Sequence, residues 1–227
     1  MSAPQTRAQS IGTLLEADIL TGRVAPGEWL RLPALAETYG VSLSPLREAL
    51  ARLVGSGLVL QESQRGFRVA PVSAEDLADL VRLRLRIETE ALSASIDAAD
   101  AAWEGALLAA QHRLSRHPRS DGKLLDEAWE RAHRDFHFAL IAGCGSPRIL
   151  AFCGTLHDHF DRYRRLGVLA AGRHPRLAGG HAAIVAAALA GDGPRATALL
   201  RAHIAEAAAE VRGMLPGLGT AIAASDA

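Results

Sequence analysis

The spacing of apolar residues in this 227-residue chain changes near Pro71, and this change constrains the fold more than any other feature. Before it, apolar residues follow helical spacing only in short stretches interrupted by glycine and proline, and segments 58–62 and 66–71 favour β-structure. After it, helical spacing continues in long stretches without a β-prone segment. The sequence therefore predicts a mainly α protein, with a mixed N-terminal domain over 1–72 and an all-α bundle over 73–215.

The N-terminal domain is predicted to contain three short helices followed by a β-hairpin. Helical spacing, glycines and prolines place the helices at 11–22, 33–39 and 42–56, with a short extended piece at 28–31. The turn Gly40-Val41 joins the second helix to the third, and these two have the proportions of a helix-turn-helix. The hairpin after them is then the wing of a winged helix-turn-helix.

The bundle is predicted to contain six helices, at 74–99, 101–116, 124–142, 147–169, 175–190 and 194–214. Three of them begin with a proline at the first helical position, where the missing N–H costs no hydrogen bond. The residues after Pro216 are rich in glycine, alanine and serine, so a disordered tail is expected over 216–227.

Charge and cysteine content narrow the classes of function. The 25 basic residues balance 25 acidic ones, so a site for nucleic acid has to be a local patch. Two cysteines cannot form a disulfide framework, which fits a reducing cytosol. No uncharged apolar run reaches about 18 residues, and no signal-peptide pattern opens the chain. A cytoplasmic protein without a membrane partner is therefore expected.

Polar and basic residues gather at the start of the third helix and around the wing. The candidates for contacts with bases or phosphates are Ser42, Ser44, Arg47 and Arg52 on the helix, and Arg65, Gly66 and Arg68 on the wing. Phosphate contacts need only a few such cations. Helix-turn-helix units also serve as packing modules with solvated arginines, and residue spacing alone leaves this alternative open.

The N-terminal domain resembles the winged helix of GntR-family transcription regulators over about residues 8–72. The resemblance is carried by Ala25-Pro26-Gly27, Leu35-Ala36, Gly40-Val41-Ser42, Pro45-Leu46-Arg47-Glu48-Ala49-Leu50, Gly57-Leu58-Val59 and Gly66-Phe67-Arg68-Val69. It implies DNA contacts for Ser42, Ser44 and Arg47, and a wing tip at Gly66 near the minor groove. Leu43 stands where many members carry a base-reading arginine, and Leu32 replaces a common glutamate.

All nine histidines lie in the predicted bundle. His133 and His137 are four residues apart and share one helix face, as two ligands of one metal would. His181 and His203 have apolar residues at neighbouring helical positions and are expected to face inward. Imidazole binds zinc, nickel and related metals, but each of these side chains can also be a hydrogen-bonded core histidine.

The remaining histidines are weaker candidates. His157 and His159 are two residues apart on a helix, so they point to different faces and cannot both turn inward. His112, His117 and His174 lie near charged or helix-terminal stretches and are expected to be exposed.

The bundle resembles the effector domain of the FadR branch of that family, the FCD domain, over about residues 76–213. Arg84-x-x-Ile87-Glu88 matches its first helix, His133-x-x-Phe136-His137 matches its central motif, and His181 and His203 fall on its last two ligand positions. The resemblance implies a divalent metal held by three histidines and usually an acid or amide, beside the effector. Here His133 replaces that residue. Either all four histidines then bind the metal or water fills the fourth position, and Glu130 is a weaker substitute.

Together the resemblances imply a transcription repressor, acting as a homodimer on a two-fold symmetric DNA operator. Its bundle is expected to bind a small carboxylate effector beside zinc or nickel, with Arg84 as a second anchor; alternatively, Arg84 pairs with Glu88, four residues later. The competing class is a metal-dependent hydrolase with an accessory winged helix. No acid adjoins the histidines in sequence as an obvious general base, and no catalytic residue is assigned.

Overall fold

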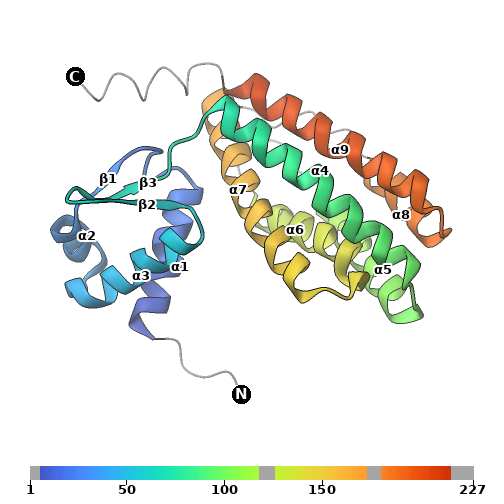
Figure 1. Ribbon diagram of the computed structural model, residues 1–227, viewed down its shortest axis with the longest axis horizontal. Coiled ribbons are helices and arrows are strands. Elements are labelled where there is room, and N and C mark those ends of the chain that lie inside the picture. The colour runs from blue at the N-terminus through green and yellow to red at the C-terminus, as the bar shows by residue number, and fades with distance from the viewer. Residues whose placement is uncertain (1–5, 118–125, 173–179, 216–227) are drawn as a thin grey trace. The chain divides into compact units, whose positions relative to one another are not determined.

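The computed structural model describes residues 6–117, 126–172 and 180–215, and in it the chain divides into two compact units. The first is formed mainly by the residues up to Ala74 and the second mainly by those that follow (Figure 1). The sequence predicted this mainly α architecture, with a small antiparallel sheet confined to the first unit, and the structure confirms it.

The N-terminal unit is a helix-turn-helix followed by a hairpin. Its elements are α1 (Arg7–Leu20), β1 (Trp29–Leu30), α2 (Leu32–Tyr39), α3 (Leu43–Gly55), β2 (Val59–Glu62) and β3 (Gly66–Val69). The strands are antiparallel in the order β1-β3-β2. Val59 pairs with Val69 in the hairpin, and Trp29 pairs with Arg68. The short extended piece predicted at 28–31 is therefore the third strand of the wing sheet.

Helix α1 begins at Arg7, earlier than the predicted start at residue 11. The cause is a capping box: the Gln9 amide donates to the Thr6 hydroxyl at 3.2 Å, and the Thr6 amide donates to the Gln9 side chain at 2.7 Å. A threonine followed three residues later by glutamine is the sequence pattern of this capping box.

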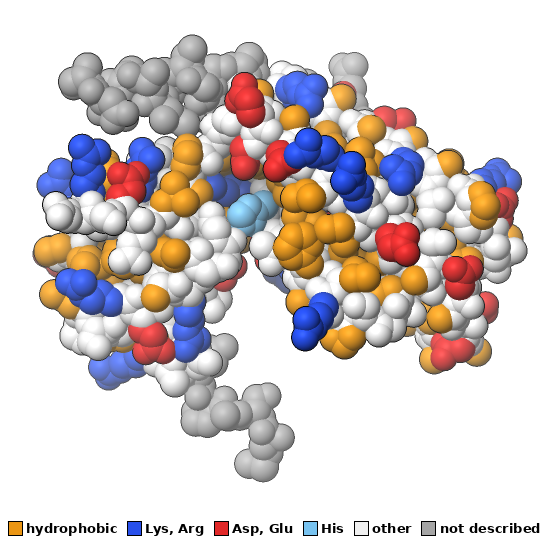
Figure 2. Space-filling model, in the orientation of Figure 1, with side chains coloured by type: hydrophobic (Ala, Val, Ile, Leu, Met, Phe, Trp, Pro, Cys, Tyr) orange, Lys and Arg blue, Asp and Glu red, His pale blue; other side chains and the backbone are white. Residues whose placement is uncertain are grey.

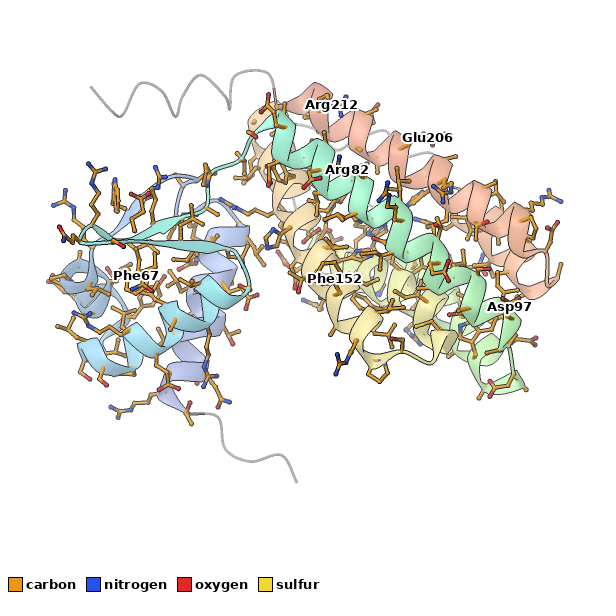
Figure 3. The ribbon with its side chains drawn as sticks, viewed as in Figure 1. Phe67, Arg82, Asp97, Phe152, Glu206 and Arg212 are labelled. Carbon is orange, nitrogen blue, oxygen red and sulfur yellow. The ribbon has the colours of Figure 1, made fainter. Side chains whose placement is uncertain are left out.

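The core of the N-terminal unit joins its helices to the sheet. Leu15, Leu46 and Leu50 are completely buried, and Phe67 enters the same cluster from β3, between the sheet and the helices (Figure 3). The buried face of α3 is thus the one that carries Leu46 and Leu50. Leu14 of α1 instead faces solvent and exposes 56% of its surface.

The second unit is an all-α bundle. Its helices are α4 (Ala74–Asp97), α5 (Ala101–Arg116), α6 (Glu127–Ile141), α7 (Pro147–Ala171), α8 (His181–Leu189) and α9 (Gly193–Met214), with a short 3-10 turn, η1 (Ala142–Cys144). No strand occurs in the part of this unit that the structure describes. Helix α6 packs along α5, and α8 along α9. The predicted helix starts at 124 and 175, the tail over 216–227 and His174 lie outside the described residues.

Side-chain caps fix where several bundle helices begin. Asp100, Asp126, Ser146 and Asp192 each accept a hydrogen bond from a backbone N–H in the first turn of the helix that follows. Between the helices, Phe136, Leu140 and Ile184 are completely buried in one core cluster. This packing fixes the inward faces of α6, α8 and α9, which carry the histidines. None of the helices described is long and apolar enough to cross a membrane.

Candidate DNA-reading and metal-binding sites

The start of α3 presents a row of exposed side chains. Ser42 occupies the N-cap position, but its side chain makes no capping hydrogen bond. Leu43, Ser44 and Arg47 follow it and are exposed, whereas Leu46 points into the core. Because the first residues of the second helix of a helix-turn-helix contact base edges in the major groove, this exposed row is the predicted reading surface.

Arg52, also proposed for DNA contact, differs from Arg47 in its surroundings. It lies near the C-terminal end of α3 and forms an exposed ion pair with Glu48, with a nitrogen–oxygen distance of 2.8 Å. Arg47 has no ion pair or hydrogen bond with any residue that the structure describes. Its guanidinium is therefore available to a base or phosphate, while a contact through Arg52 has to compete with Glu48.

The wing tip combines an exposed glycine with arginine side chains. Gly66 is exposed with a φ of 99°, a left-handed conformation that favours glycine, and Arg65 beside it is also exposed. Arg68 pairs with Glu62 across the hairpin at 2.8 Å and lies 5.6 Å from the centre of the Trp29 ring. Figure 2 shows arginine side chains over this part of the N-terminal unit. The wing thus offers the exposed Arg65 to a phosphate, whereas Arg68 is already paired with Glu62.

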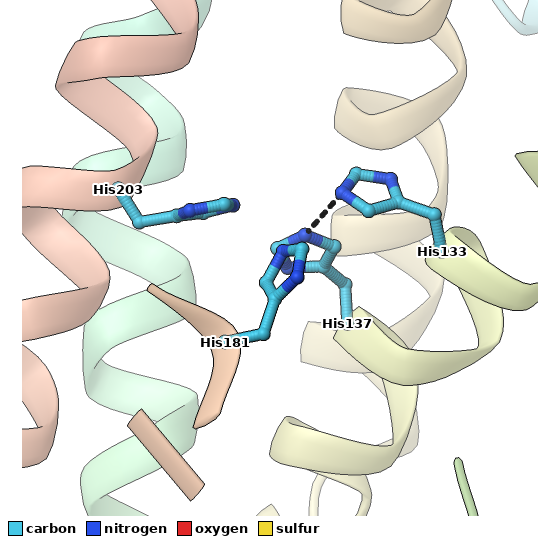
Figure 4. Close-up of side chains that lie close together, drawn as sticks. All are labelled: His133, His137, His181 and His203. Carbon is cyan, nitrogen blue, oxygen red and sulfur yellow. Dashed lines mark hydrogen bonds between the residues drawn. The ribbon is translucent and has the colours of Figure 1, made fainter. Parts of the chain in front are cut away.

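Four histidines converge in the bundle from three helices (Figure 4). His133 and His137 come from α6, His181 is the first residue of α8, and His203 comes from α9. One ligand nitrogen of each lies within 4.8 Å of the corresponding nitrogens of the others. His133 Nε2 is 3.1 Å from His137 Nε2, and the ring centroids of His181 and His203 are 4.6 Å apart. We call this group the histidine tetrad.

Burial makes two of these imidazoles poor bases. Burial lowers the pKa of His137 well below its usual value, and the neighbouring imidazoles lower it further. Burial also lowers the pKa of His203 to about 4, with a contribution from the charge of Arg84. Both rings are therefore neutral at pH 7, which is the form that binds a metal ion.

The tetrad fits a divalent transition metal in donor type and spacing. Two nitrogens bound to one zinc ion at about 2.0–2.1 Å lie roughly 3–3.4 Å apart, which matches the His133–His137 separation. The buried Nδ1 of His137 has no hydrogen-bond partner among the described residues. The Trp129 ring stacks on His133 with centroids 4.5 Å apart and planes at 16°, which orients that imidazole. Glu130 is buried one turn earlier but is not part of the tetrad.

A second buried group adjoins the tetrad. Glu88 of α4, His137 and His157 of α7 also bring ligand atoms within 4.8 Å of one another. Arg84 donates to both carboxylate oxygens of Glu88, at 2.6 and 3.2 Å. Burial alone would raise the pKa of Glu88, but Arg84 and His157 lower it to about 2. Because the guanidinium already neutralises Glu88, this second group is a poorer cation site than the tetrad.

The position of Arg84 agrees with the salt-bridge alternative predicted from its spacing to Glu88. Its side chain is buried. The central carbon of the guanidinium, Cζ, also lies over the Phe160 ring, 4.4 Å from the ring centroid. His157 was not assigned a role from the sequence, although its Nε2 lies 3.4 Å from Glu88. The signal available was the two-residue spacing to His159: only one of the pair can face inward, and the structure buries His157.

The other histidines lie as expected where the structure describes them. His112 and His117 are exposed, and His159 is half-buried. These side chains therefore provide natural controls for substitutions within the tetrad.

Comparisons with known proteins agree with both halves of this description. Residues 7–69 match the model of the bacterial regulatory proteins of the gntR family, and residues 79–206 match the FCD domain. The chain is 41% identical over 205 residues to the HTH-type transcriptional regulator BphR of Paraburkholderia xenovorans, covering 87% of this chain and 82% of that protein. It is 38% identical over 196 residues to the HTH-type transcriptional repressor GlaR of Escherichia coli, covering 84% and 89%.

A solved structure has the same fold. Escherichia coli McbR/YncC superposes with a TM-score of 0.70 over 92% of this chain and 99% of that chain, at 19% sequence identity. The matched families and the named relatives are transcription regulators and not enzymes, so the hydrolase alternative has no support. The chain belongs to the GntR family, in the group whose members carry an FCD domain.

Proposed function

We propose that this regulator is a metal-containing sensor of a small carboxylate, which acts as a homodimeric repressor. The observation that carries the proposal is the histidine tetrad: four imidazoles from three helices, two of them fully buried, converge within 4.8 Å. Burying imidazole rings such as those of His137 and His203 is unfavourable unless something satisfies their nitrogens. A bound zinc or nickel ion would do so through nitrogen ligands that suit both metals.

The number of histidines bears on how an effector binds. A divalent ion in the tetrad would supply a positive centre for the carboxylate of an effector. Four protein ligands leave a tetrahedral zinc ion no open position. Effector binding therefore requires either an expanded coordination number or the departure of His133, which is half-buried and is oriented by Trp129.

Arg84 is the proposed second anchor for the effector. Its guanidinium is buried beside His203, whose pKa it lowers, so it lies near the tetrad. Glu88 occupies the edge of the guanidinium formed by Nε and Nη2, which is one of the edges that a carboxylate can bind in a bidentate way. An effector carboxylate therefore has to displace Glu88 from Arg84, or share the guanidinium with it.

The small size of the reading surface supports dimerisation, and the name of a similar protein supports repression. One recognition helix reads only a few base pairs, so two copies across a two-fold symmetric operator are the usual route to useful affinity. The similar protein GlaR is named a repressor, which supports the same direction of regulation here.

Elemental analysis of the purified full-length chain tests the metal. Wild type is expected to retain about one divalent transition ion per chain, and the His137→Ala and His203→Ala variants are expected to lose it. The exposed His112→Ala variant is the matched control and should retain the ion. Wild-type occupancy in both tetrad variants would return these residues to the role of core histidines.

The sensing role needs a second measurement. Small mono- and dicarboxylates are added to the metal-loaded protein while binding to operator DNA is followed. A responsive carboxylate should change operator affinity roughly 5- to 150-fold, the usual range of coupling between two sites. The His181→Ala variant should bind operator but not respond. A wild-type response in that variant would place the sensing pocket away from the tetrad.

A further inference from the structure

One large apolar side chain stands on the reading surface. Leu43, the first residue of α3, exposes 43% of its surface, whereas Leu46, Leu50 and Leu53 of the same helix are buried. Single exposed leucines are common on proteins and need no explanation by themselves. This one, however, lies in the first turn of the helix that reads DNA, where side chains contact base edges.

The neighbours of Leu43 place it among DNA contacts. Residues four apart on a helix share a face, so Leu43 and Arg47 lie side by side, one turn apart. Arg47 is exposed and has no partner among the described residues, and Ser44 is exposed beside them. The surface that enters the groove thus combines one apolar group with a cation and a hydroxyl.

The chemistry of the major groove indicates what such an apolar group selects. Guanine, cytosine and adenine present donors and acceptors there, while thymine adds an apolar 5-methyl group. Leucine offers no hydrogen bond, so packing it on a guanine or cytosine edge leaves polar groups unpaired. Packing it on a thymine methyl removes apolar surface of both partners from water.

We infer that Leu43 is a specificity-determining residue, which selects a thymine in each half of the operator by contacting its 5-methyl group. The inference uses the DNA-binding role of the family and the exposure of Leu43. The contact of Leu43 with thymine does not depend on a bound metal or effector. If the proposed metal or effector site is disproved, the proposed role of Leu43 is unaffected.

The test uses the full-length protein and DNA duplexes selected by it from a randomised pool. Selection should yield a conserved A·T pair in each half-site, and this pair should lose its preference when selection is repeated with the Leu43→Ala variant. In the wild-type site, the thymine of each such pair is then replaced by deoxyuridine, which removes the methyl group and leaves the hydrogen-bonding edge unchanged.

Removing the thymine methyl and removing the Leu43 side chain should each weaken operator binding through the same contact. Removing one methyl should weaken wild-type binding roughly three- to fivefold, and removing both should weaken it about tenfold or more. Leu43→Ala should bind the thymine duplex more weakly than wild type and should bind the thymine and deoxyuridine duplexes equally.

Leu14→Ala is the matched control, since Leu14 is an exposed leucine on α1 of the same unit. It should keep the full dependence on the methyl group. Unfolding midpoints equal to that of wild type would show that both variants are folded. The inference is overturned if wild-type binding is indifferent to the methyl at every selected A·T pair. It is also overturned if Leu43→Ala keeps the same loss, or if selection yields no such pair.

Discussion

The two functional regions of this regulator are built in opposite ways. The reading surface uses exposed residues that lie close together in the sequence, such as Ser44 and Arg47 of one helix turn. The tetrad uses histidines up to 70 positions apart, from His133 to His203, which only the packing of three helices brings together. Side chains of the first region can therefore change without unfolding the protein, whereas those of the second are coupled to the stability of the bundle.

The largest effect is expected from the buried ion pair that adjoins the tetrad. Replacing Glu88 by Gln leaves the Arg84 guanidinium buried without a counter-charge, which should lower the free energy of unfolding by about 3–5 kcal/mol. Glu48→Gln removes the acid of an exposed pair with the same spacing and should cost at most about 1 kcal/mol. Denaturant unfolding measures both. Equal losses would contradict the contrast between buried and exposed regions.

The Glu88 pair also has a signature in pH. The pKa of Glu88 is about 2 in the folded chain and 4.5 in its unperturbed state, so unfolding at low pH takes up a proton. The stability that Glu88 contributes is thus fully present above pH 4.5 and is lost as pH falls toward 2. Glu88→Gln should lack this part of the acid dependence, and an unchanged slope between these pH values would argue against the pair.

Metal binding should stabilise the bundle and leave the reading surface unaffected. At a free zinc or nickel concentration of about 100 times the dissociation constant, the free energy of unfolding should rise by about 2.7 kcal/mol. Chelation should remove this gain from wild type and from His112→Ala. The His203→Ala variant should show no gain to remove. Equal stabilisation of all three proteins would assign the bound ion to another site.

At the reading surface, Arg47→Ala should weaken operator binding by about 1–3 kcal/mol if the guanidinium contacts a base. Because Arg47 is exposed and unpaired among the described residues, the unfolding midpoint should not move. Arg52→Ala should have the smaller effect, since Glu48 already pairs with Arg52. Gel-shift titrations at one fixed salt concentration compare them. Wild-type affinity in Arg47→Ala would remove that residue from the site.

The smallest effect concerns the stacking of Trp129 on His133. Trp129→Phe should weaken metal binding by about 0.5–1.5 kcal/mol, because a smaller ring orients the imidazole less well. Trp103→Phe is the control, since Trp103 donates a hydrogen bond to the Ala139 carbonyl and does not stack on the tetrad. Competition with a chromophoric chelator gives both affinities. Identical losses would show a general effect of core packing.

Most of the fold could be predicted from the sequence because its helices carry strong local signals. The helical periodicity after Pro71 acts within a few residues, and α5 and α7 begin at 101 and 147, as the sequence predicted. The pairing of β1 with β3 was not predicted, because a two-residue strand has no periodicity and depends on contacts distant in the sequence.

In the candidate sites, too, features set by local spacing could be predicted and features set by helix packing could not. Spacing alone placed His133 and His137 on one helix face and predicted that His181 and His203 face inward, and the structure brings all four together. The stacking of Trp129 and the position of His157 beside Glu88 depend on how α4, α6 and α7 pack, which no local pattern encodes. Arg84 illustrates the limit: its spacing to Glu88 predicted an ion pair and the resemblance implied an effector anchor, but only the ion pair is a property of the chain alone.

The central claim, that the tetrad holds a metal ion, is tested most directly by X-ray absorption spectroscopy of the zinc-loaded full-length protein. The expected spectrum shows only nitrogen or oxygen ligands at about 2.0–2.1 Å, with the scattering pattern of three or four imidazoles. His133→Ala should lose one imidazole if that residue is a ligand and none if water fills its position. Sulfur ligands at about 2.3 Å, or a spectrum with fewer than three imidazoles, would contradict the account.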